Sequence, residues 1–119
     1  MKIYIAFRYS RPSNVLDILA NIGAAIEAGV EVAKKGHYPY IPHLDCLVAM
    51  WSKGSLPIEY YYASGMEWLK CCDAMLLLDE SDLKINGGNN GVAREYQWAV
   101  ENKMPIYKSV GEIPIGVFW

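Results

Sequence analysis

The chain has 119 residues, of which 53% are hydrophobic, and carries a formal net charge of −2 at pH 7. This length is typical of one domain, so we expect residues 1–119 to form a single domain around one core. The balance of charges offers no basic field for nucleic acid, although a small anionic ligand needs only a few local donors. The N-terminus lacks the apolar segment of a signal peptide, and no apolar run is long enough to span a membrane, which predicts a cytoplasmic protein without a membrane partner. The apolar surplus predicts a homodimer or higher homo-oligomer.

The first part of the chain has the pattern of a strand followed by a helix. Residues 2–7 (KIYIAF) form an apolar run with β-branched and aromatic members, which is typical of a central strand. Apolar side chains then recur at helical spacing over residues 15–33. Ser13 is the expected N-cap of this helix, and Gly36 is its expected end.

Two glycines within this helix, Gly23 and Gly29, predict that the helix packs closely on the sheet, because glycine otherwise weakens a helix. Residues 37–41 (HYPYI) predict a second strand. Pro39 places that strand at the edge of the sheet, where a missing N–H does least harm. Residues 42–57 are ambiguous, and a short helix or a loop is expected there.

The second half of the chain continues the alternation. Residues 58–72 and 91–102 have helical patterns. Residues 74–78 form a continuous apolar run, as expected of a strand buried on both faces. Residues 105–107 predict a fourth strand, and residues 116–119 a fifth.

Strands that alternate with helices predict a parallel sheet with right-handed crossovers and helices on both faces. We therefore expect a three-layer α/β sandwich with four to five strands in the order 2-1-3-4-5. The order reverses between strands one and three, and ligands bind beyond the carboxyl ends of the strands at such a point. Residues 7–11 and residues 79–95 would meet there.

The polar segment 87–91 (GGNNG) lies just ahead of the last predicted helix. Its glycines permit positive φ, and Asn90 is the expected N-cap. Free N–H groups at a helix N-terminus attract an anion, and Arg8 and Ser10 could donate to the same anion. The alternative is that such a loop ends a strand for steric reasons alone.

Glu95 lies one turn into this helix. Gly91 precedes it by four residues on nearly the same face, so we expect open space over the carboxylate. The helix N-terminus is expected to favour the ionised form, which can act as a nucleophile at an electrophilic carbon. The alternative is a solvated glutamate paired with Arg94 or Lys103.

Three stretches, KIYIAFRYS, MEWLKCCDAMLLLDES and NNGVAREYQWAVENKMPIY, resemble in the same order segments of the nucleoside 2-deoxyribosyltransferase-like superfamily. GHYPYIPHL also resembles a segment of its small uncharacterised members. The resemblance covers residue 2 to about residue 108. It implies a flavodoxin-like fold, assembly as dimers or higher oligomers, and action on a nucleoside or nucleotide without a metal or organic cofactor.

The resemblance also implies roles for individual residues. Glu95 matches the nucleophile that attacks the anomeric carbon of a 2-deoxynucleoside or its 5-monophosphate, and Tyr9 matches a hydroxyl that orients it. This chemistry agrees with that of retaining glycosidases. The residues expected to bind the substrate are Phe7, Arg8, Ser10, His43, Gly88, Asn89, Asn90 and Gly91.

The chain departs from the pattern at the proton donor. Characterised relatives carry aspartate where this chain has Gly65, and aspartate or serine where it has Asn89, and neither glycine nor asparagine can be a general acid. Asp79, with Glu80 and Asp82 as alternatives, is expected to supply the proton instead. If no residue does, the chain is a nucleotide or nucleotide-sugar binding module without turnover.

The cysteines and histidines indicate neither a disulfide framework nor a metal site. Three cysteines, two of them adjacent, predict reduced thiols. The segment HLDC, which starts at His43, has no recognised ligand spacing, so no metal is expected there.

Overall fold

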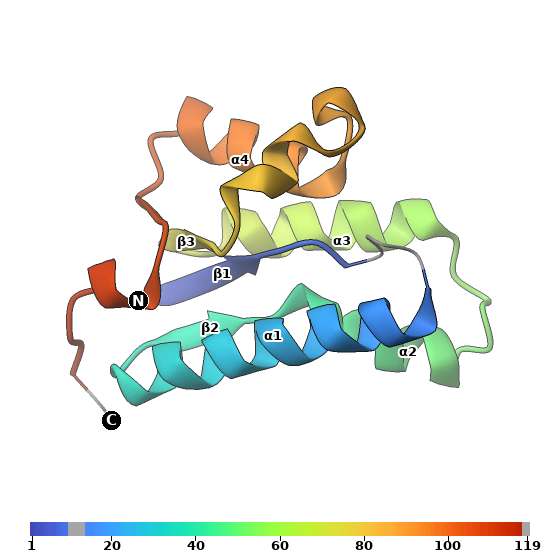
Figure 1. The fold of residues 1–119 in the computed structure, drawn as a ribbon, viewed down its shortest axis with the longest axis horizontal. Coiled ribbons are helices and arrows are strands. Elements are labelled where there is room, and N and C mark those ends of the chain that lie inside the picture. Colours follow the sequence, from blue (N-terminus) through green and yellow to red (C-terminus); the bar gives the residue numbers. More distant parts are fainter. Residues whose placement is uncertain (10–13, 118–119) are drawn as a thin grey trace.

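The computed structural model describes residues 1–9 and 14–117, which form a three-layer α/β sandwich (Figure 1). The sheet has four strands, all parallel, in the order β2-β1-β3-β4. The strands are β1 (Lys2–Ala6), β2 (Tyr38–Tyr40), β3 (Ala74–Leu77) and β4 (Ile106–Tyr107). The predicted flavodoxin-like topology is confirmed. Residues 116–117 of the expected fifth strand form no strand, and residues 118–119 lie outside the described part.

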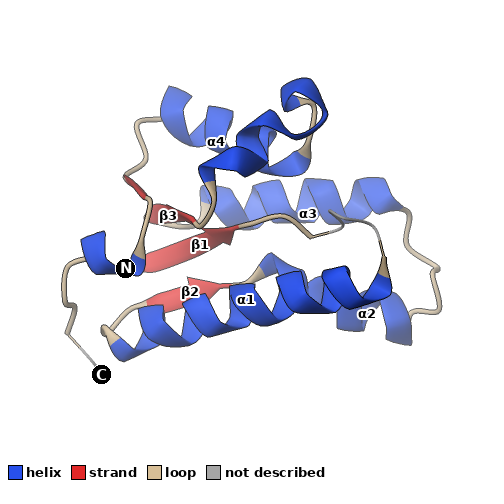
Figure 2. Ribbon diagram, viewed as in Figure 1, coloured by secondary structure: helices blue, strands red, loops and turns tan. Residues whose placement is uncertain are grey.

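Helices cover both faces of the sheet (Figure 2). Helix α1 lies on one face, and α3 and α4 lie on the other (Figure 1). The helices are α1 (Val15–Lys34), α2 (Asp45–Trp51), α3 (Ile58–Lys70) and α4 (Gly91–Glu101), with short 3-10 helices η1 (Pro42–Leu44), η2 (Glu80–Gly88) and η3 (Val110–Glu112). No helix in residues 1–9 and 14–117 combines the length and the apolar character needed to cross a membrane.

Strand β1 separates two hydrophobic cores because its side chains alternate between the faces of the sheet. Ile3 and Ile5 are fully buried in the core under α1. Tyr4 and Ala6 are buried in the core under α3 and α4. The alternation therefore directs the Tyr4 side chain toward the layer that contains Glu95.

The first helix differs in two details from the prediction. Ser13 lies outside the described residues, and the N-cap is Asn14, whose side chain accepts a backbone hydrogen bond of 2.9 Å from the first turn. Gly29 packs closely as predicted, because an added Cβ would lie 2.5 Å from Ile41 Cδ1. The prediction for Gly23 is wrong, since nothing lies within 4 Å of a Cβ added there.

Candidate functional site

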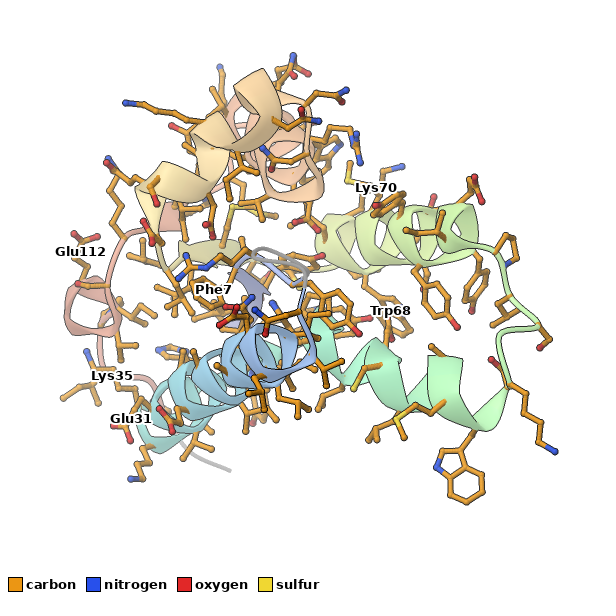
Figure 3. The ribbon with its side chains drawn as sticks, turned by 45° about the vertical axis from the view of Figure 1, so that its right-hand side comes forward. Phe7, Glu31, Lys35, Trp68, Lys70 and Glu112 are labelled. Carbon is orange, nitrogen blue, oxygen red and sulfur yellow. The ribbon has the colours of Figure 1, made fainter. Side chains whose placement is uncertain are left out.

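A cavity of about 630 Å³ lies beyond the carboxyl end of β1. Its walls come from the segment after β1, from η1 and α2, from α3, and from the segment that joins η2 to the first turns of α4. Phe7, which lines it, lies between the α1 layer and the α3 and α4 layer (Figure 3). The structure thus brings together the two polar segments that the strand order predicted to meet.

Most of the predicted site residues line this cavity. They are Phe7, Arg8, Tyr9, His43, Asn89, Asn90, Gly91 and Glu95. Asp79 and Gly88 are not among the residues that line it. Ser10 lies outside the described residues.

Glu95 is hydrogen-bonded to a tyrosine, but this tyrosine is Tyr4 and not the expected Tyr9. The Tyr4 hydroxyl donates a short hydrogen bond to Glu95 Oε2. Burial and the neighbouring carboxylate raise the pKa of the Tyr4 phenol, so it remains a donor at any ordinary pH. Tyr9 lies elsewhere in the same cavity, with its ring edge-on to His43 at a centroid distance of 6.2 Å. The residue that holds the Glu95 carboxylate is therefore Tyr4.

The protonation of Glu95 also differs from the prediction. Burial raises the pKa of Glu95 to about 7, although the Tyr4 hydrogen bond and the Arg94 charge both favour the ionised form. Glu95 is the fifth residue of α4, and the field of a helix N-terminus fades within the first turn. Desolvation therefore outweighs the helix terminus, and near neutral pH the carboxyl is divided between its two forms.

This raised pKa makes the stability of the fold depend on pH. Because the pKa of Glu95 lies near 7 in the folded protein and near 4.5 when unfolded, its contribution is complete below pH 4.5 and is lost as the pH rises to 7. From pH 5 to pH 8 we expect wild type to lose about 2 kcal/mol of unfolding free energy relative to Glu95→Gln. Urea denaturation at four pH values measures this difference, and parallel pH profiles for the two proteins would contradict it.

Two glycines leave space around the Glu95 carboxylate. A Cβ added to Gly65 would lie 3.2 Å from the Tyr4 hydroxyl and 3.8 Å from Glu95 Oε2. A Cβ added to Gly91 would meet only Tyr62 Cε1, at 4.0 Å. The expected open space near Gly91 is present, and Gly65 contributes more space on the side of the hydroxyl.

Arg8 is not a free anion donor, contrary to the prediction. Its Nη1 lies 2.9 Å from Asp79 Oδ2 and 3.0 Å from Asp82 Oδ1, and its backbone N–H donates to Asp82 Oδ2 at 2.9 Å. Two carboxylates therefore neutralise the guanidinium. Asp82 is completely buried, so this network holds the turn after β1 against η2.

Asp79 is poorly suited to act as the general acid. Hydrogen bonds from Ser81 and from Arg8 lower the pKa of Asp79. A general acid needs a pKa near the working pH and must reach the leaving group. Asp79 meets neither condition, because its proton is lost early and its side chain does not line the cavity.

The glycine and asparagine segment ahead of α4 has the predicted cap. The Asn90 side chain accepts a hydrogen bond of 2.8 Å from the backbone N–H of Ala93. Gly87 and Gly88 have φ values of +63° and +87°, in the region that favours glycine. Gly91 is the first residue of α4 and has no positive φ. Its contribution is the open space that its missing side chain leaves beside the carboxylate.

The cavity also contains residues that the sequence did not identify. Asp45, at the start of α2, lines the cavity, and burial raises its pKa. Arg94 forms no salt bridge with any described residue, and its guanidinium lies over the Tyr62 ring at 5.1 Å from the centroid. Tyr4 is the site residue that the sequence could have indicated most clearly. A tyrosine in a buried central strand needs a hydrogen-bond partner for its hydroxyl.

Neither bound metal nor disulfide chemistry is indicated by the described residues. Within residues 1–9 and 14–117, no three His, Cys, Asp or Glu side chains are grouped so as to hold a metal ion. Cys46, Cys71 and Cys72 form no disulfide; Cys71 is exposed, and the other two are partly buried. A comparison with family models, curated proteins and solved structures found no match to this chain.

Proposed function

We propose that the protein cleaves or transfers the N-glycosidic bond of a 2-deoxynucleoside or its 5-monophosphate, with Glu95 as the nucleophile. The observation that supports this proposal best is a carboxyl group at the wall of a cavity, held by the Tyr4 hydroxyl and left uncovered by Gly65 and Gly91. A cavity of about 630 Å³ is in the size range of small-molecule sites. No part of this chemistry requires a cofactor.

The reaction takes two steps. An oxygen of the ionised Glu95 carboxylate bonds to the anomeric carbon while the carbon–nitrogen bond breaks, and the bonding electron pair passes to the base nitrogen, which takes up a proton. Water or a second base then attacks the same carbon, the glycosyl ester bond breaks, and Glu95 leaves as a carboxylate. The Tyr4 hydrogen bond keeps the attacking group in place throughout.

Asp45 is the best-placed proton donor for the leaving base. Among the described residues that line the cavity, the other carboxyl groups are Asp82 and Glu95. Both oxygens of Asp82 accept hydrogen bonds from Arg8. Burial raises the pKa of Asp45, which favours the protonated acid. In the second step, the water that attacks the sugar can return a proton to Asp45.

The direct test is to incubate the protein with a panel of 2-deoxynucleosides and their 5-monophosphates and to detect free base by chromatography. Release of base from at least one of them supports the proposal. Binding without release, seen as a thermal shift, would instead support a nucleotide-binding module. The pKa of Glu95 is about 7, so below pH 7 most of the carboxyl is protonated and cannot attack the substrate. The assay is therefore run at pH 8, where the carboxylate predominates.

We further propose that the protein forms a homodimer through α1. Leu16, Leu19, Gly23, Ile26 and Val30 follow one another at alternating spacings of three and four, which places them on one stripe of the helix. Leu16 and Leu19 are 78% and 58% exposed. The stripe is symmetric about Gly23: in an antiparallel pair of α1 helices that cross there, Leu16 of each copy faces Val30 of the other.

A single charge on this stripe tests the assembly. We expect wild type to have a mass of roughly 27 kDa in solution, twice 13.4 kDa, and Leu19→Glu to be a monomer, because a charge would be buried at the contact. Size-exclusion chromatography with light scattering measures both. Val100→Glu is the matched control, because Val100 is an exposed residue of α4 in the other layer, and this variant should stay dimeric. A monomeric wild type would rule the contact out.

A further inference from the structure

The buried ring of His43 has a defined tautomer. His43 is 4% exposed, and its Nε2 lies 2.9 Å from the carbonyl oxygen of Phe7 and 3.1 Å from that of Arg8. Carbonyl oxygens can only accept, so Nε2 carries the hydrogen. Burial lowers the pKa of His43, which keeps the ring neutral. Nδ1 is therefore an acceptor with no hydrogen of its own.

This acceptor has no partner, and a second polar atom in the cavity wall shares that property. His43 Nδ1 and the Tyr61 hydroxyl are both shielded from water, and neither has a hydrogen-bond partner in the described part of the chain. Both residues line the cavity. Native structures rarely leave such atoms unpaired, so each one calls for a group that residues 1–9 and 14–117 do not supply.

The charges nearby limit what that group can be. An unprotonated oxygen of a phosphate or carboxylate would set its lone pairs against those of Nδ1. Asp45 lines the same cavity. The Arg8 charge is already taken by Asp79 and Asp82. The missing partner is thus a group that donates a hydrogen bond, and the uncharged N–H and O–H groups of a nucleoside meet this requirement.

We propose that His43 Nδ1 and the Tyr61 hydroxyl form a subsite for an uncharged N–H or O–H group of the ligand. This inference rests on the proposed function and deepens it, since a nucleoside carries such groups on the edge of its base and on its sugar. Phe7, Tyr9 and Tyr62 also line the cavity, and the rings of Phe7 and Tyr9 lie next to that of His43. Flat rings stack on such side chains, which favours the base edge as the donor.

Tyr9 is an aromatic neighbour of His43 in the cavity wall. Its ring lies edge-on to His43, and the residue is 43% exposed. Side chains with this exposure change rotamer within nanoseconds. Rotation of Tyr9 would uncover the His43 ring, and a ligand there would stack against the displaced tyrosine.

The test compares two variants with a matched control, all in the Glu95→Gln background so that no turnover occurs. Tyr61→Phe removes only the unpaired hydroxyl, and His43→Gln keeps an N–H for the Phe7 carbonyl while removing the ring nitrogen Nδ1 from its position. Tyr60→Phe alters a 48% exposed tyrosine of the same helix that does not line the cavity. Titration calorimetry measures the Kd of each variant for 2-deoxyadenosine and 2-deoxycytidine.

We expect Tyr61→Phe and His43→Gln to raise the Kd for at least one of these nucleosides about tenfold, and Tyr60→Phe to leave it unchanged. If the Tyr61 hydroxyl had only a structural role, Tyr61→Phe would lower the Tm of the unliganded protein. We expect the Tm to be equal or higher, because the variant removes an unpaired buried group. Purine 2-deoxyriboside, which lacks the exocyclic amine, and free 2-deoxyribose identify the donor. If the variants no longer raise the Kd for purine 2-deoxyriboside, the donor belongs to the base. If they raise the Kd for both compounds, the donor belongs to the sugar.

Equal Kd values for both variants and their parent, or no binding of any probe to the parent, would overturn the subsite. Its failure is separable from failure of the proposed reaction. Base release by wild type with unchanged affinities in the variants removes the subsite alone. Weaker binding by the variants without base release from wild type removes the catalytic role of Glu95 alone.

Discussion

Replacing Glu95 by Gln should lower the rate of base release by at least about a thousandfold, since loss of a nucleophile removes the covalent route altogether. The amide has the size of the carboxyl group and can still accept the Tyr4 hydrogen bond, so the fold and the cavity are retained. The measurement is the rate of base release at pH 8 by chromatography, with a circular dichroism spectrum to verify folding.

Glu101→Gln is the matched control for this change. Glu101 lies on the same helix, is exposed, and accepts a hydrogen bond of 3.1 Å from Gln97. It should release base at the wild-type rate. Mass spectrometry of wild type quenched during turnover should find the sugar attached to the peptide that contains Glu95. Equal rates for wild type and Glu95→Gln would remove the proposed nucleophile.

Replacing Asp82 by Ala should destabilise the protein by about 3 kcal/mol, because it removes one of the two carboxylates that pair with a partly buried guanidinium and leaves a backbone N–H without its partner. Asp82 is fully buried and accepts from both groups of Arg8, whose side chain is 29% exposed. Asp79 still pairs with the guanidinium in this variant. The expected loss of unfolding free energy therefore lies at the lower end of the range for a broken buried ion pair. Urea denaturation at pH 7 measures the change.

The control for Asp82 is an exposed ion pair at the same helix. Glu80 pairs with Lys108, and both side chains are more than half exposed. Glu80→Ala should therefore change the unfolding free energy by less than about 0.5 kcal/mol. If Asp82→Ala cost no more than Glu80→Ala, the network of Arg8 would not be what holds the turn after β1.

The order of strands and helices could be predicted because each depends on local patterns. The apolar run at residues 74–78 and the helical spacing over residues 15–33 correspond to β3 and α1 to within a few residues. Asn90 caps α4 as expected because a cap needs only residues within one turn. The fifth strand was predicted wrongly for residues 116–117, because an apolar composition does not supply a pairing partner.

The location of the candidate site could also be predicted, but its internal bonds could not. Residues after β1 and before α4 meet because the strand order requires it. Tyr4 is the partner of Glu95 because its side chain leaves β1 on the face that carries α4, whereas Tyr9 lies three residues beyond the end of this strand. The role of Gly23 likewise depended on which side of α1 faces the sheet, and it faces away.

The sequence by itself determined the kinds of elements, their order and the edge of the sheet at which polar segments gather, because hydrophobic periodicity and capping act over a few residues. Only the tertiary structure decided the state of the groups at that edge. The hydrogen bond of Glu95 joins residues 91 positions apart, and the pairing of Arg8 with Asp82 spans 74. Burial and partners at such separations decide whether a carboxyl holds its proton and whether an arginine is free, and no local pattern encodes them.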